Sequence, residues 1–145
     1  MTTEFSGTNV PSEQSQVALH LMINQLSVST MPSATRRGSY IMNEIPSEIY
    51  VRADSQKLAT VLGTLLNTVI SQSSDSCIRV SAKPFGDVML VHIRDHHNLS
   101  GRRFNVCLGQ AQKMAEIIGG TVTVNEYREA ETTIALSFMN LPEAA

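Results

Sequence analysis

One stretch decides the fold: residues 50–70, YVRADSQKLATVLGTLLNTVI. Its apolar side chains recur at steps of three and four residues, which is the period of a helix with one buried face. Asp54 precedes them, and an aspartate caps a helix well because its carboxylate accepts hydrogen bonds from free backbone N–H groups. The stretch therefore predicts a strand over Ile49–Arg52 and then a long helix that begins after Asp54. The apolar positions of that helix are Leu58, Val61, Leu62, Leu65, Leu66, Val69 and Ile70.

The sequence before this stretch predicts a polar tail, a helix and a strand. Residues 1–12 show no apolar period and are expected to be a disordered tail. The apolar residues of Ser12–Val28 suit a helix with a broad apolar face, and Pro32 and Gly38 are expected to end it. Ser39–Ile45 then predicts a strand that stops at Pro46.

The sequence after it predicts two hairpins with a helix between them. Alternating apolar residues indicate the strands, and Gly119-Gly120 indicates a left-handed end to the helix. Hairpins mixed with helices predict an α+β fold, a two-layer sandwich with the helices on one face of a mixed, mostly antiparallel sheet. The expected elements are strands Cys77–Lys83 and Val88–Arg94 around Pro84-Phe85-Gly86, a helix over Asn105–Ile118, and strands Thr121–Glu126 and Thr132–Met139.

Composition and charge exclude several classes of protein. The 145 residues carry 11 basic and 13 acidic side chains, a net charge of -2, with no basic stripe for neutralising nucleic-acid phosphates. The longest apolar runs are too short to span a membrane, and the first residues do not resemble a signal peptide. Cys77 and Cys107 are the two cysteines, too few for a disulfide framework, and both are interpreted as small buried side chains. We therefore expect a single cytoplasmic domain that binds neither nucleic acid nor membrane.

Residues 50–70 resemble the strand and first long helix of the ATPase domain of histidine kinases, in the GHKL superfamily. In that family an Asp is followed four residues later by a Leu, and then by Val-Leu-x-Asn-Leu-Leu-x-Asn-Ala. The later elements keep the family order: a hairpin, an Asp at the end of its second strand, a helix ending in Gly-Gly, and a closing hairpin with Thr-Thr. The resemblance implies a Bergerat-type ATPase fold over residues 39–141, preceded by an N-terminal helix and linker over 13–38.

The family's nucleotide-binding residues are mostly replaced in this sequence. Two asparagines of the family helix, which face the nucleotide and magnesium, align with Thr64 and Thr68. Asn67 adjoins the second position, but one step along a helix turns a side chain by about 100°, so Asn67 is not expected to substitute. A threonine hydroxyl can still ligate magnesium. Thr64 and Thr68 are therefore candidate positions of a degenerate nucleotide pocket.

The glycine boxes of the family are altered as well. Asp95 matches the aspartate that contacts the adenine amino group in the family, but His97 and Leu99 replace the two glycines that follow it. Asn105–Leu108 takes the place of the second glycine box, whose free N–H groups cradle phosphates. The resemblance thus implies a domain that has lost ATP, with no bound cofactor, no catalytic residue and no metal ligand. The adjacent His96 and His97 are read as a solvated pair, since no third ligand lies near them in sequence.

The resemblance leaves three functions open. The first is a non-catalytic signalling module of bacterial two-component or phosphorelay regulation that contacts a kinase, a response regulator or a phosphotransfer protein, and forms a homodimer through the N-terminal helix. The second is an active ATP- and magnesium-dependent protein kinase, of the histidine kinase type or the anti-sigma-factor serine kinase type. The third is a small-ligand domain that reuses the nucleotide pocket. His20 on the N-terminal helix lacks the acidic residue and proline that follow a family phosphoacceptor, so it is interpreted as a packed or interface histidine.

Overall fold

The computed structural model describes residues 14–95, 109, 111–127 and 131–140. For residues 14, 125–127, 131 and 132 it describes the backbone alone. The expected tail over residues 1–12 lies outside this part, as do the positions of His96, His97, Leu99 and Asn105–Leu108. Residues 111–117 form a helical segment without a label. The labelled elements are β1 (Gln14–Ala18), α2 (Leu19–Arg36), β2 (Tyr40–Asn43), β3 (Tyr50–Asp54), α3 (Ser55–Gln72), β4 (Cys77–Phe85), β5 (Val88–Asp95), β6 (Thr121–Tyr127) and β7 (Glu131–Met139).

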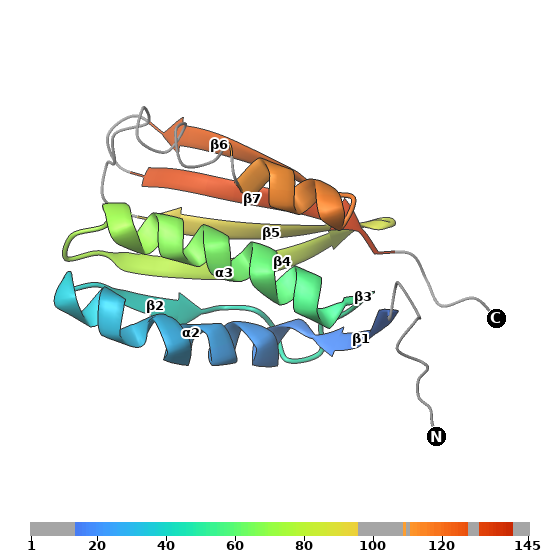
Figure 1. Cartoon of the computed structure of the whole chain (residues 1–145), viewed down its shortest axis with the longest axis horizontal. Helices are drawn as coiled ribbons and strands as arrows, with labels where there is room; N and C mark the ends of the chain where they lie inside the picture. Colours follow the sequence, from blue (N-terminus) through green and yellow to red (C-terminus); the bar gives the residue numbers. More distant parts are fainter. Residues whose placement is uncertain (1–13, 96–108, 110, 128–130, 141–145) are drawn as a thin grey trace, which may run out of the picture.

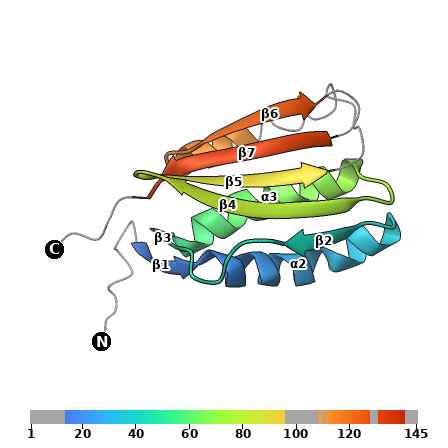
Figure 2. The same cartoon turned by 180° about the vertical axis from the view of Figure 1, so that it is seen from behind.

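Five of these strands form one sheet in the order β2-β4-β5-β7-β6. The β2–β4 pair is parallel and the other three pairs are antiparallel. Strands β1 and β3 form a separate antiparallel pair. Helices α2 and α3 and the helical residues 111–117 all lie over the same face of the five-stranded sheet, as the two opposite views show (Figures 1 and 2). The predicted α+β architecture, with helices on one face of a mixed, mostly antiparallel sheet, is confirmed.

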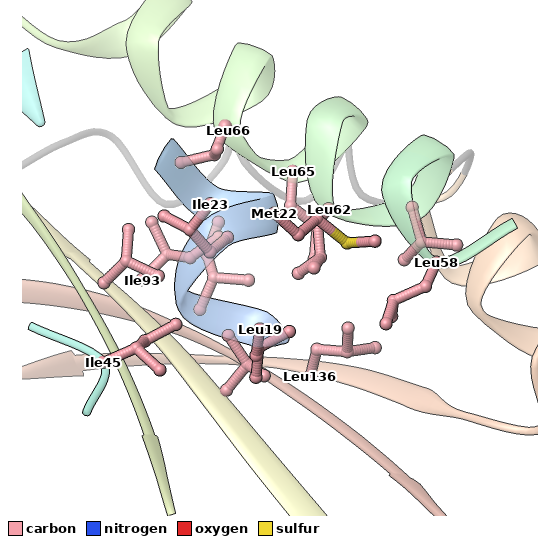
Figure 3. Packing of buried hydrophobic residues seen from close by; sticks show 14 of the residues in the cluster. Leu19, Met22, Ile23, Ile45, Leu58, Leu62, Leu65, Leu66, Ile93 and Leu136 are labelled. Carbon is pink, nitrogen blue, oxygen red and sulfur yellow. The ribbon is translucent and has the colours of Figure 1, made fainter. Parts of the chain in front are cut away.

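The hydrophobic core lies between the helices and the sheet (Figure 3). Helix α3 supplies the largest share, and all seven apolar positions predicted for it are buried. The sheet meets them with alternate residues of its central strands, because successive side chains of a strand point to opposite faces. The buried strand residues are Ile78, Val80, Met89, Val91, Ile93, Ile134, Leu136 and Phe138.

Helix α3 begins where the sequence predicts. The side chain of Asp54 accepts hydrogen bonds from the backbone N–H groups of Gln56 and Lys57, at 3.1 and 3.2 Å. These N–H groups have no partner inside the helix, so the carboxylate satisfies donors that water would otherwise have to serve. The capping role predicted for Asp54 is confirmed.

The bounds predicted for the N-terminal helix were wrong. Residues 14–18 form β1, which pairs with β3, and α2 begins only at Leu19 and continues through Pro32 to Arg36. Proline inside a helix removes one hydrogen bond at a cost of about 3 kcal/mol. The last turns are kept because Thr30 and Ala34 on either side of Pro32 are buried against the rest of the protein.

The two strands predicted on either side of Pro46 are present but lie in different sheets. Strand β2 joins β4, whereas β3 pairs with β1. The division of the chain into residues 13–38 and 39–141 stays a prediction.

The helix over residues 111–117 ends as predicted, at Gly119-Gly120. Gly119 has a φ of +72°, which favours glycine. The N–H groups of Gly119 and Gly120 donate to the carbonyls of Glu116 and Ala115, at 3.1 and 2.8 Å, so the end of the helix is closed by the usual glycine motif. A methyl group on Gly120 would lie only 2.7 Å from the carbonyl oxygen of Ser137. Glycine at this position therefore lets the helix end approach β7.

Candidate functional site

The candidate site is built on the flank of α3 that faces the helical residues 111–117. Thr60, Thr64 and Thr68 are four residues apart, so they follow one another along this flank. The hydroxyl of Thr64 donates a hydrogen bond to the sulfur of Met114, at 3.4 Å. This contact joins the two helices at the position where the resemblance expects the first nucleotide-facing side chain.

Thr68 uses its hydroxyl inside α3. The hydroxyl donates to the backbone carbonyl of Thr64, four residues earlier, at 2.9 Å. Both threonines are half-buried. Their hydroxyl hydrogens are therefore committed to protein acceptors, and only the oxygen lone pairs remain to serve a ligand.

Asp95 is the last residue of β5 and is 1% exposed. The register of the sheet places it between Ile78 of β4 and Thr132 of β7. In both views β5 and α3 run in the same direction, so Asp95 lies at the end of the sheet where α3 also ends (Figures 1 and 2). A ligand would reach this carboxylate only after the residues that cover it had moved.

Asn67 is adjacent to Thr68 on α3 and points about 100° away from it. It lines a groove between the C-terminal halves of α2 and α3, with a cavity volume of about 1050 Å³. That Asn67 does not substitute for Thr68 stays a prediction.

The groove between α2 and α3 was not predicted from the sequence. Arg36 at the end of α2 and Arg37 directly after it line the groove on one side, and Asp75 lines it from the loop after α3. Buried serines join the segments that follow α2 and α3: the hydroxyls of Ser39 and Ser73 are 2.9 Å apart, and the N–H of Ser76 donates to the Ser39 hydroxyl at 3.2 Å. The serine-rich stretch Ser71–Ser76 was the available signal, but only the fold brings it beside Arg36 and Arg37. The other lining residues are Ser33, Thr35, Gly38, Asn67, Ile70, Ser71 and Ser74.

A smaller hollow adjoins the threonine flank near the start of α3. Its volume is about 210 Å³, and Val61, Met114 and Ile117 give it an apolar lining beside Lys57, Gln56 and Thr60. A second hollow of about 280 Å³ shares Lys57 and Ile117 with it. Hollows of this size hold a side chain of a partner more readily than a nucleotide, since ligand pockets typically measure about 300–1,000 Å³.

His20 is engaged with the main chain. Its Nδ1 lies 2.6 Å from the carbonyl oxygen of Ile45, and the side-chain amide of Asn43 donates to the carbonyl of His20 at 2.9 Å. These contacts hold the start of α2 against the segment after β2. The geometry is that of a packed histidine, as the sequence predicts.

Two side chains with shifted pKa values lie outside the candidate site. Burial lowers the pKa of His92, and the charge of Arg94 lowers it further. A hydrogen bond with Cys77 raises the pKa of Tyr40. Among the described residues no group of three or more His, Cys, Asp or Glu side chains is placed to hold a metal ion. The helices of that same part of the chain include none that is long and apolar enough to cross a membrane.

The fold was compared with known proteins. No protein-family model and no curated protein sequence matches this chain. Among solved structures, histidine kinase AdeS of Acinetobacter baumannii is similar with a TM-score of 0.77 and 10% identity, over 92% of this chain and 71% of that one. The catalytic domain of histidine kinase ThkA gives 0.75 and 16%, over 90% and 99% of the two chains.

A third solved structure contains a partner protein. Histidine kinase ThkA in complex with the response regulator TrrA is similar with a TM-score of 0.71 and 14% identity, over 90% of this chain. This chain spans 42% of that kinase chain, so the similarity concerns one part of it. At such identities these likenesses establish the fold, which is that of histidine kinase catalytic domains.

Proposed function

We propose that this chain is a non-catalytic interaction module of two-component or phosphorelay regulation, with a degenerate nucleotide site, acting in the cytoplasm. The observation that carries the proposal is the contact of Thr64 with Met114. It joins α3 to residues 111–117 on the flank where a kinase of this fold would present an asparagine to its nucleotide. A hydroxyl that donates to sulfur inside a helix contact is a poor replacement for an amide that must orient phosphate oxygens.

The second threonine supports the same proposal. The hydroxyl of Thr68 donates to the carbonyl of Thr64 within α3. Thr68 would have to break this hydrogen bond before its hydroxyl could donate to a ligand. Magnesium prefers near-ideal octahedral coordination by oxygen atoms and releases its water reluctantly. Two threonines held in this way, without a carboxylate beside them on α3, offer it little.

The proposed partner is a protein of the two-component class. A kinase of the same fold has been solved in complex with a response regulator, which supports a partner of that kind for this module. A kinase and a phosphotransfer protein belong to the same class of partner. Self-association through the N-terminal helix is the second kind of protein contact that we propose.

Nucleotide binding tests the proposal directly. The protein is titrated in a calorimeter with the magnesium complex of a non-hydrolysable ATP analogue, and we expect no heat of binding up to millimolar nucleotide. The double variant Thr64→Asn/Thr68→Asn, which restores the family side chains, serves as a matched comparison. Binding by the unaltered chain with micromolar affinity would contradict the proposal.

An active ATP-dependent kinase is the second candidate function, and the position of Asp95 favours it. This carboxylate stands at the end of β5, where the family places its adenine contact. If the unaltered chain binds nucleotide, the variant Asp95→Asn should weaken that binding at least tenfold. Transfer of labelled phosphate from ATP to the chain itself or to a receiver domain would then establish the kinase.

A further inference from the structure

The outward face of α2 carries three large apolar side chains. Leu21, Val28 and Met31 are 60%, 67% and 55% exposed. Leu21 and Val28 are two helical turns apart and so point in nearly the same direction. The broad apolar face that the sequence suggested for dimerisation is divided by the fold, since Leu19 and Ile23 are fully buried in the core whereas Leu21 is exposed. The exposed residues of α3, by contrast, are all polar: Ser55, Gln56, Lys57, Thr60, Asn67 and Ser71.

This face of α2 is also uncharged. From Leu19 to Thr35 the helix contains no Asp, Glu, Lys or Arg, and its first such residue is Arg36 at the end. The exposed residues around Leu21 and Val28 on this face are amides, a proline and a hydroxyl: Asn24, Gln25, Pro32 and Thr35. A surface without charges offers nothing to a partner chosen by opposite charge. It can meet a copy of itself without the repulsion that like charges would cause.

We propose that two copies of this chain associate through this face of α2, with the two helices antiparallel around a twofold axis. Such an interface uses the same patch on both subunits. An axis between Leu21 and Val28 places Leu21 of one copy against Val28 of the partner subunit, and the reverse. Asn24 and Gln25 then lie at the axis, where the amide of Gln25 supplies both a donor group and an acceptor, and Asn24, whose side-chain oxygen accepts from Asn43 at 2.8 Å, supplies its NH₂ group.

The size of the face sets the strength of the dimer. An 18-residue helix is about 27 Å long, so one helix covers less than the roughly 800 Å² per partner of a standard stable interface. The dimer is therefore weak and reversible, and it exchanges with monomer at micromolar concentrations. This self-association deepens the proposed interaction role and rests on it, yet it is measured on the protein alone, without nucleotide or receiver domain.

Sedimentation velocity over protein concentrations from the low micromolar to several hundred micromolar tests the proposal. The unaltered chain should shift from monomer to dimer across this range. Val28→Glu should raise the dissociation constant at least tenfold, and Leu21→Gln should act in the same direction. Ser29→Glu is the matched control, since it places the same charge on the same helix about 100° away from Val28 and should change dimerisation less than threefold.

Cross-linking then tests the orientation of the helices. In a background where Cys77 and Cys107 are replaced by serine, Leu21→Cys and Val28→Cys variants are treated with a short bis-maleimide, separately and mixed. Antiparallel helices should cross-link efficiently only in the mixture, whereas parallel helices would cross-link within each single variant.

Three results would overturn the proposal. One is a chain that stays monomeric at several hundred micromolar. Another is equal loss of dimer in Ser29→Glu and Val28→Glu. The third is a monomer whose Val28→Glu variant loses binding to a receiver domain, which would assign the face to that partner. Circular dichroism shows whether each variant is folded, and because both target side chains are exposed, folding should be retained.

Discussion

The hydroxyl of Thr64 lies 3.4 Å from the sulfur of Met114, to which it donates a hydrogen bond across two helices. Fifty residues separate these side chains in the sequence. Their contact places residues 111–117 directly on the flank of α3 that a nucleotide-binding relative of this fold would keep for its ligand.

Shortening Met114 should loosen this helix contact. Met114 is half-buried beside the core, so Met114→Ala should lower the free energy of unfolding by about 1–2 kcal/mol, less than for a fully buried methionine. Met31→Ala removes the same atoms from an exposed site and should change the free energy of unfolding by less than about 0.5 kcal/mol in dilute protein. Urea unfolding of both variants measures the difference, and equal effects would show that Met114 does not hold the helix in place.

Gly120 should not tolerate a side chain. The added methyl group of Gly120→Ala would lie 2.7 Å from the carbonyl oxygen of Ser137. Because this oxygen belongs to the backbone, the backbone must move to relieve the clash. Overpacking of this kind costs about 1–3 kcal/mol. Gly109→Ala meets no atom within 4 Å and should be neutral or slightly stabilising. Thermal unfolding compares the two, and a neutral Gly120→Ala would contradict the close approach of the helix end to β7.

The cap of α3 should contribute measurably to stability. Asp54→Ala leaves the N–H groups of Gln56 and Lys57 without their side-chain acceptor, which should cost about 1 kcal/mol. Asp54→Asn keeps an oxygen in the same place and should lose much less. The midpoints of chemical unfolding give the order of the three proteins, and an asparagine variant as weak as the alanine variant would argue against a capping role.

His92 should make stability fall at acidic pH. Its pKa in the folded protein lies below the ordinary value of 6.5, because burial and then Arg94 disfavour the charged ring. As the pH falls below 6.5 the unfolded chain takes up a proton that the folded protein resists, so the folded state loses stability until the pH passes the folded pKa. His92 faces Ser81 and Ala135 on the neighbouring strands.

The contribution of His92 is isolated by a variant. His92→Thr suits a strand and does not titrate, so the difference in unfolding free energy between the two proteins should change between pH 7.5 and pH 5. The unaltered protein should lose more stability over this interval. A difference that stays constant with pH would show that the ring is as easily protonated in the folded protein as in the unfolded chain.

The elements that local patterns specify were predicted well. Helix α3 with its Asp54 cap, the hairpin of β4 and β5, and the glycine end of residues 111–117 all depend on residues close together in sequence. The N-terminal bounds were wrong because β1 exists through its pairing with β3, and the last turns of α2 exist through burial of Thr30 and Ala34. No local pattern around Gln14 or Pro32 contains those contacts.

The candidate site divides in the same way. Helical periodicity alone places Thr64 and Thr68 on one flank of α3 and turns Asn67 about 100° away from Thr68. Three other features depend on segments that only the fold brings together. They are the contact of Thr64 with Met114, the burial of Asp95, and the groove that Arg36 and Arg37 share with Asp75.

By itself the sequence determined the fold of this protein and the replacement of the family's ligand-binding side chains, because hydrophobic period, capping and side-chain type are properties of short stretches. Only the tertiary structure decided which apolar residues of α2 enter the core and which remain outside. An amphipathic pattern with apolar residues on both sides leaves that choice open. The choice is settled by the side of α2 that α3 and the sheet can cover. Leu21, Val28 and Met31 lie on the other side of α2.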